Sequence, residues 1–96
     1  MVNLNKVKEI LFLLKPQLIS KYPIRSIGLF GSILRDDFTQ ESDIDIIVEF
    51  NGEIGIEFID LANELEIKLN WKVDLVSRAG IKPKYLAVID PQIIYI

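Results

Sequence analysis

The spacing of hydrophobic residues changes several times along the chain, and each spacing predicts a different element. Apolar positions recur at three- and four-residue steps over residues 4–20 and over residues 55–69, the period of an amphipathic helix. Over residues 43–50, apolar and polar positions alternate, which predicts a strand with one apolar face. Short apolar runs at residues 26–30 and 71–77 predict two further strands.

Residues that interrupt or end helices refine these boundaries. Pro16 lacks a backbone N–H, so it is expected to kink or divide the first helix. Asn70 suits the left-handed conformation that commonly ends a helix, so we expect the second helix to stop there. A short helix is expected over residues 82–90, followed by an apolar strand in the terminal sequence QIIYI. The sequence therefore predicts helices and strands in alternation up to the last residues of the chain.

This alternation predicts a single α/β or α+β domain over residues 1–96. The expected architecture is a small mixed β-sheet of about four strands that is covered by helices. Gly31-Ser32 would form a turn after the strand at 26–30, and one or two helical turns would follow it.

Composition and charge exclude several classes of protein. The chain has no cysteine and no histidine, which rules out a disulfide framework, a thiol nucleophile and a histidine-based zinc site. A net charge of -3 gives no strong nucleic-acid footprint. No apolar run approaches the ~20 residues of a membrane span, and the run at 10–14 is too short for a signal peptide. We therefore expect a soluble, cytoplasmic protein with no membrane partner.

Three aspartates form the candidate metal site. Asp43 and Asp45 lie two apart on one expected strand, so their side chains emerge on the same face with α-carbons about 6–7 Å apart. Asp74 lies on a second expected strand and also faces away from the core side. If the two strands are neighbours, the three carboxylates converge. Oxygen ligands without nitrogen or sulfur favour magnesium or manganese.

A small-residue turn supplies a candidate phosphate site. Gly31 allows backbone N–H groups to approach an anion closely, Ser32 adds a hydroxyl donor, and a following helix would add favourable partial charge. Arg35 could reach the same anion with its planar guanidinium. Most isolated Gly-Ser pairs are plain turns, and many Asp-x-Asp pairs are solvated charges. Asp36 and Asp37 are expected to be solvated charges of that kind.

Together these motifs resemble a known family. Gly31-Ser32, ten intervening residues, Asp43-Ile44-Asp45 and the later Asp74 resemble the nucleotidyltransferase superfamily of DNA polymerase β type. The short length is similar to its minimal nucleotidyltransferase (MNT) branch. The resemblance implies transfer of AMP from ATP with Mg²⁺, two ions being expected. Gly31 and Ser32 would hold the triphosphate, and Asp43 and Asp45 would ligate the metals. Asp74 would ligate one metal and help the acceptor hydroxyl to lose its proton.

The resemblance also implies a partner. Members of the branch are often antitoxins that transfer AMP to a tyrosine of a HEPN-domain ribonuclease toxin. Two alternatives stay open: an antitoxin that neutralises its toxin by binding alone, and a transferase that acts on a small molecule or an RNA end. The chain departs from the family at one point. It has Leu34-Arg35-Asp36 where the family often has Ala-Arg-Gly, so Asp36 is expected either to face solvent or to weaken nucleotide binding.

Overall fold

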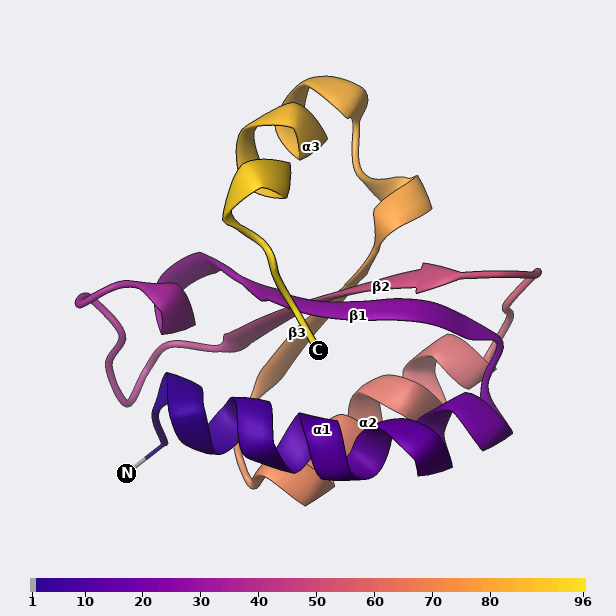
Figure 1. Ribbon diagram of the computed structural model, residues 1–96, viewed down its shortest axis with the longest axis horizontal. Coiled ribbons are helices and arrows are strands. Elements are labelled where there is room, and N and C mark those ends of the chain that lie inside the picture. The colour runs from indigo at the N-terminus through magenta and orange to yellow at the C-terminus, as the bar shows by residue number, and fades with distance from the viewer. Residues whose placement is uncertain (1) are drawn as a thin grey trace.

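Helices and strands alternate along the chain nearly as the hydrophobic pattern predicts (Figure 1). The structure, a computed structural model, describes residues 2–96. The helices are α1 (Leu4–Lys21), α2 (Glu57–Leu69) and α3 (Pro83–Ile89), and the strands are β1 (Ile24–Phe30), β2 (Ile44–Phe50), β3 (Val73–Ser77) and β4 (Ile94–Tyr95). Short 3-10 turns η1 (Gly31–Leu34), η2 (Arg78–Gly80) and η3 (Asp90–Gln92) connect them.

The four strands form one mixed sheet in the order β3–β2–β1–β4. β1 pairs antiparallel with both β2 and β4, whereas β2 and β3 are parallel. A parallel pair needs a crossover connection, and α2 supplies it. The predicted α+β class and mixed four-stranded sheet are confirmed.

The main core lies between the sheet and the two longer helices. In Figure 1, α1 and α2 run side by side under one face of the sheet, and α3 lies on the other side. Alternation along β2 places Ile44, Ile46 and Val48 toward these helices, and each is fully buried. Their helical neighbours in the core are Val7, Leu11, Leu18, Leu61, Leu65 and Leu69.

The opposite face of the sheet is apolar over part of its area. Ile47 lies on the side that alternation assigns to polar residues, yet it is only 2% exposed. It is covered because the chain returns over this face after α3. Gly28 of β1 leaves room for that return: a β-carbon there would lie 2.5 Å from Ile93 and 3.2 Å from Tyr95.

Two boundary predictions have different outcomes. Asn70 ends α2 in the left-handed conformation, with φ 51° and ψ 46°, as predicted. Of the two effects expected of Pro16, division of the first helix is wrong, because α1 continues through it, and a kink stays a prediction. Pro16 lies on the exposed side of α1, so water can hydrate the Phe12 carbonyl that it leaves without an N–H donor. No helix among residues 2–96 has the length and hydropathy that a membrane span requires.

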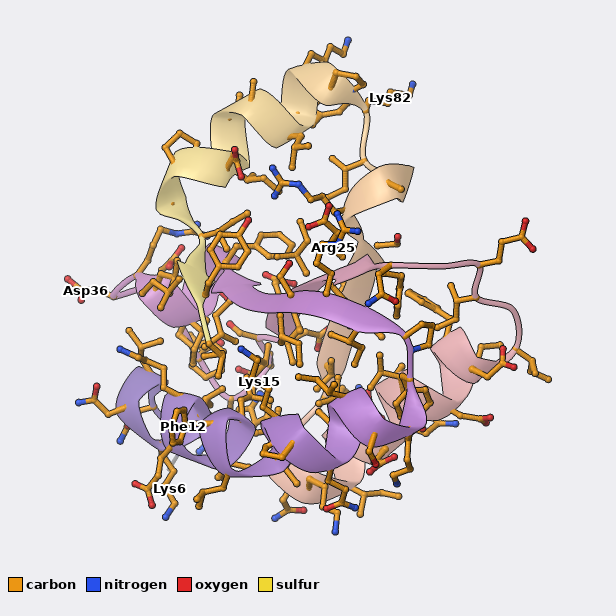
Figure 2. All side chains as sticks on the ribbon, turned by 45° about the vertical axis from the view of Figure 1, so that its right-hand side comes forward. Lys6, Phe12, Lys15, Arg25, Asp36 and Lys82 are labelled. Carbon is orange, nitrogen blue, oxygen red and sulfur yellow. The ribbon has the colours of Figure 1, made fainter. Side chains whose placement is uncertain are left out.

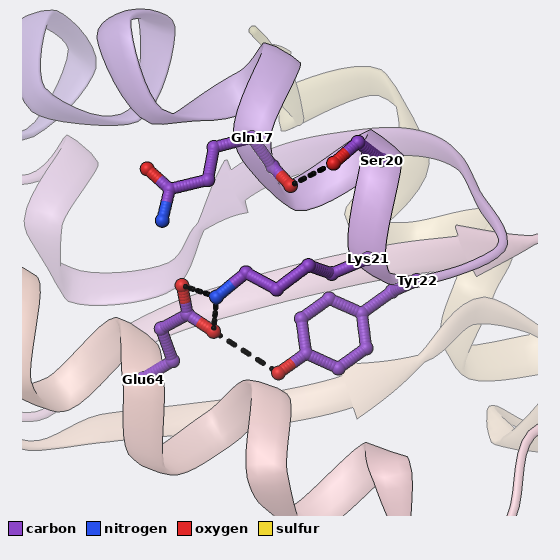
Figure 3. Close-up of polar contacts among 5 residues, drawn as sticks. All are labelled: Gln17, Ser20, Lys21, Tyr22 and Glu64. Atoms are coloured by element: carbon purple, nitrogen blue, oxygen red, sulfur yellow. Dashed lines mark hydrogen bonds and ion pairs between the residues drawn. The ribbon is translucent and has the colours of Figure 1, made fainter.

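A polar cluster joins α1 to α2 (Figure 3). The ammonium of Lys21 donates to both oxygens of Glu64, at 2.9 and 2.8 Å. The hydroxyl of Tyr22 donates to the same carboxylate at 3.0 Å. These bonds lower the pKa of Glu64, the Lys21 bond contributing most. The cluster fixes how the end of α1 meets the middle of α2.

Candidate active site

Asp45 and Asp74 lie directly opposite each other on the parallel strands β2 and β3. Neighbouring strands are about 4.8 Å apart, and side chains that are directly opposite share a face. That face is the one turned away from α1 and α2. Asp45 is half-buried, whereas Asp74 is exposed. The neighbouring strands on which the sequence prediction depended are therefore present.

Asp43 joins this pair from the residue before β2. It lies two residues from Asp45, it is exposed, and its charge raises the pKa of Asp45. Among residues 2–96, however, no three acidic side chains are gathered closely enough to enclose one ion. The expected three-carboxylate cluster is thus a pair on neighbouring strands, with a third carboxylate near enough to raise the pKa of Asp45.

Asp45 has the most perturbed environment of the three. Its pKa is raised to about 6, first by burial and then by the charges of Asp74 and Asp43. A hydrogen bond from the Ser32 backbone and the positive charge of Arg35 act in the opposite direction. A carboxylate with this environment gains from an adjacent cation, which would offset both the burial and the repulsion.

Gly31 brings the turn into contact with Asp45. Phe30 of β1 is paired with Asp45 of β2, so the chain turns at Gly31 directly beside the carboxylate. Gly31 has φ 78°, and a β-carbon added to it would overlap the Asp45 carboxylate. With Ser32 bonded to the same carboxylate, the two motifs form one site.

The helix expected after this turn is much shorter than predicted. η1 spans four residues and is a 3-10 turn, closed by the Arg35 N–H bond to the Ser32 carbonyl at 2.9 Å. Because only a few peptide groups are aligned in so short a turn, it supplies little of the positive partial charge that a helix N-terminus was expected to provide. The remaining anion donors of the turn are the Ser32 hydroxyl and the backbone N–H groups other than that of Ser32, which donates to Asp45.

Arg35 and Asp36 are both exposed in the loop that follows the turn. Arg35 forms an ion pair with Asp37 at 3.2 Å, and both side chains are exposed. Its guanidinium is close enough for its positive charge to lower the pKa of Asp45. Asp36 points outward from the loop into solvent (Figure 2), the first of the two outcomes expected for it. A role for Arg35 in binding phosphate stays a prediction.

Sequence analysis missed one residue beside the site. Trp71 is half-buried against the core, and its indole N–H also donates to the Ser42 carbonyl at 2.7 Å. Its ring also packs against Phe38, with ring centres 5.7 Å apart. The available sequence signal was its position, directly after the helix-ending Asn70 and three residues before Asp74.

Two surface hollows lie near opposite ends of β2, the strand that carries Asp45. One of about 210 Å³ borders the segment before Asp43 and is lined by Gln40, Ser42, Trp71 and Lys72. A larger one of about 460 Å³ is lined by Glu49, Phe50, Ser77, Arg78 and Leu86, at the opposite end of β2 from Asp45. The acidic pair itself is open to solvent through Asp74, which suits a large acceptor.

Comparison with known sequences points to one family. Residues 13–92 match the nucleotidyltransferase domain family. The chain is 42% identical, over the full length of both, to a Methanocaldococcus jannaschii protein that carries a provisional name as a protein adenylyltransferase. It is 34% identical to the protein adenylyltransferase MntA of Thermococcus cleftensis, covering 100% of this chain and 98% of that protein.

Solved structures agree with the sequence matches. The chain superposes with a TM-score of 0.67 on the toxin–antitoxin complex MntA–HpeT, at 29% identity, covering 100% of this chain and 72% of that chain. It superposes with a TM-score of 0.69 on a complex of the tri-AMPylated HEPN toxin of Shewanella oneidensis with an MNT antitoxin, at 25% identity over 93% of this chain and 70% of that one. With its Gly-Ser turn placed against the acidic pair, the chain belongs to the nucleotidyltransferase domain family.

Proposed function

We propose that this protein transfers AMP from ATP to a tyrosine hydroxyl of a HEPN-domain toxin and acts as its antitoxin. The observation that carries the proposal is the placement of Asp45 and Asp74 side by side, with the Gly31-Ser32 turn against Asp45. Relatives named as protein adenylyltransferases and a structural neighbour in complex with an AMPylated HEPN toxin support the acceptor class.

The donor groups of this face fit Mg²⁺. They are carboxylate oxygens from Asp45 and Asp74, with Asp43 two residues away, and the chain has no cysteine or histidine to favour a softer metal. Asp43, Asp45 and Asp74 would share two ions between them, since the three side chains are not gathered closely enough to enclose a single ion. When bound, Mg²⁺ would neutralise charge on the triphosphate and lower the pKa of the attacking hydroxyl.

The protein's own groups have separate tasks in the reaction. The Gly31 backbone N–H and the Ser32 hydroxyl bind and orient the triphosphate, because the Ser32 N–H already donates to Asp45. Asp74, which is exposed, receives the proton of the acceptor hydroxyl. The acceptor oxygen forms a bond to the α-phosphorus as the bond to the bridging oxygen breaks, and pyrophosphate leaves. Catalysis of this kind depends on positioning and fixed charge, which a 96-residue domain can supply.

The acceptor must come from another molecule. Asp74 lies on β3, an edge strand of the sheet, and no described element covers it. A protein surface can therefore bring a tyrosine to this edge without first opening a lid. This openness favours a protein acceptor over a small molecule, which would need an enclosing pocket for specificity.

The proposal is tested by transfer of label from ATP labelled at the α-phosphate, in Mg²⁺, to a purified HEPN partner. We expect labelled toxin with the parent protein and none with Asp43→Asn plus Asp45→Asn. Glu49→Gln is the matched control, because it removes one carboxylate from the same face of β2 and should leave labelling intact.

The same variants separate the alternatives. Neutralisation of the toxin that survives Asp43→Asn plus Asp45→Asn, with no labelled toxin from the parent, would show an antitoxin that acts by binding alone. If label enters a small molecule or RNA of a host lysate instead of the toxin, the acceptor proposed here is wrong.

A further inference from the structure

Asp43 lies between two hydrogen bonds that both come from the connection joining α2 to β3. On one side of it, the indole N–H of Trp71 donates to the Ser42 carbonyl at 2.7 Å. On the other side, the Ile44 N–H donates to the Lys72 carbonyl at 2.9 Å. We propose that Trp71 is a positioning residue of the active site, which holds the backbone of Asp43 so that its carboxylate faces the Asp45–Asp74 pair.

The segment before Asp43 does not hold the backbone of Asp43 against the sheet by its own hydrogen bonds. Residues 39–42 form a turn that is closed by bonds within itself: Ser42 N–H to the Thr39 carbonyl at 3.1 Å, and Thr39 N–H to the Ser42 hydroxyl at 3.0 Å. These bonds keep the turn in shape but do not attach it to the sheet. The Trp71 indole makes that attachment at the carbonyl immediately before Asp43.

Trp71 is itself held firmly at the end of α2. The left-handed Asn70 reverses the chain, and the Trp71 N–H reaches back to the Glu66 carbonyl at 3.4 Å. The Glu66 carboxylate accepts from the Val73 N–H at 3.0 Å. Asp74 follows Val73 directly, so one short connection determines where both Asp43 and Asp74 lie.

Packing alone does not explain why residue 71 is a tryptophan rather than another aromatic residue. Contact with Phe38, at 5.7 Å between ring centres, needs only an aromatic ring at position 71. The N–H adds a directional bond in a partly buried setting, where loss of the donor leaves the Ser42 carbonyl without that partner. Groups behind metal ligands commonly change metal affinity by roughly tenfold or more when they are removed.

The inference rests on the proposed role of Asp43 as a metal ligand, and Trp71→Phe tests it because phenylalanine keeps the ring but removes the donor. We expect Trp71→Phe to weaken Mn²⁺ binding, measured by electron paramagnetic resonance titration, by roughly tenfold. In an Asp43→Asn background the same change should cause no further loss. Phe58→Leu is the control: it disturbs the Phe50–Phe58 contact at the far end of β2 and should leave Mn²⁺ affinity unchanged.

A second measurement is independent of metal and of AMP transfer. In Trp71→Phe, amide hydrogen exchange at Ile44 should accelerate more than exchange at Leu65 in the centre of α2, because the backbone around Asp43 is released locally. The inference would be overturned if exchange accelerated equally at both amides. It would also be overturned if the parent protein bound Mn²⁺ and Trp71→Phe bound it with the same affinity. If the AMP-transfer proposal is wrong, the parent protein gives no labelled toxin, but hydrogen exchange at Ile44 is still accelerated in Trp71→Phe.

Discussion

The α-carbon of Gly31 lies against the carboxylate of Asp45, and no side chain fits between them. This contact explains why a glycine and an aspartate fourteen positions apart belong to one site. The antiparallel pairing of Phe30 with Asp45 brings the turn to the carboxylate, and the positive φ of Gly31 turns the chain there. The Gly31-Ser32 turn and the strand that carries Asp45 are thus a single unit.

Gly31→Ala should disable this unit. Alanine would overlap the Asp45 carboxylate, and it would adopt a left-handed conformation that costs about 1–2 kcal/mol of folding free energy. We expect AMP transfer to be lost and thermal unfolding to occur at lower temperature. Gly80→Ala is the matched control, since a β-carbon there meets nothing within 4 Å. A Gly31→Ala variant with the parent's stability and transfer rate would contradict the geometry.

Stability should depend on pH through Asp45. Its pKa is raised to about 6, so the folded protein holds this proton more tightly than the unfolded chain does. Stability is therefore lost as pH rises from about 4 through 6, by on the order of 1 kcal/mol for a partly solvated group. Asp45→Asn should raise the melting temperature at pH 8 in chelator and change it little near pH 4. The control is Asp36→Asn in the exposed loop; an equal shift at both pH values for Asp45→Asn would contradict this origin.

Divalent metal should stabilise the folded state through the acidic pair. A ligand that binds only the folded protein raises its unfolding free energy in proportion to the logarithm of ligand concentration. We expect Mg²⁺ to raise the melting temperature of the parent at pH 8 and to have little effect on Asp74→Asn. Chelation with EDTA should remove both this shift and AMP transfer. Glu49→Gln should respond like the parent, and a full Mg²⁺ response in Asp74→Asn would place the ion elsewhere.

The Lys21–Glu64 pair should contribute modestly to stability at neutral pH. Glu64 is only 15% exposed and its pKa is lowered, so its contribution is present above its unfolded pKa and is lost as pH falls. Glu64→Gln should reduce the unfolding free energy by about 1 kcal/mol at pH 7, because Lys21 is half-exposed and solvent screens the pair. Urea titrations at pH 7 and pH 3 check this, with exposed Glu53→Gln as control. A difference that persists at pH 3 would assign the effect to packing.

Most of the fold was predictable because it depends on local periodicity. Alternation along 43–50 placed Ile44, Ile46 and Val48 in the core, and Asn70 marked the end of α2. The burial of Ile47 was not predictable, because it depends on the return of distant residues around Ile93 over the second face.

The sequence indicates which residues form the candidate site, but it does not indicate the contacts between them. The side-by-side placement of Asp45 and Asp74 was expected only if their strands were neighbours, a condition that tertiary pairing decides. The overlap of Gly31 with Asp45 depends on strand register, and the Trp71 bond to Ser42 depends on how α2 ends. Neither follows from spacing along the chain.

Because β2 and β3 are parallel, a growing chain must complete α2 before Asp74 can meet Asp45. β1 and β2 need only their connecting loop, so their hairpin can form much earlier. A protein truncated before β3, or locally unfolded there, would then retain the β1–β2 hairpin but lack a complete site. A newly made chain could become active only after synthesis had passed residue 77. Pulse-labelled hydrogen exchange during refolding should show protection of β3 amides after those of β1 and β2.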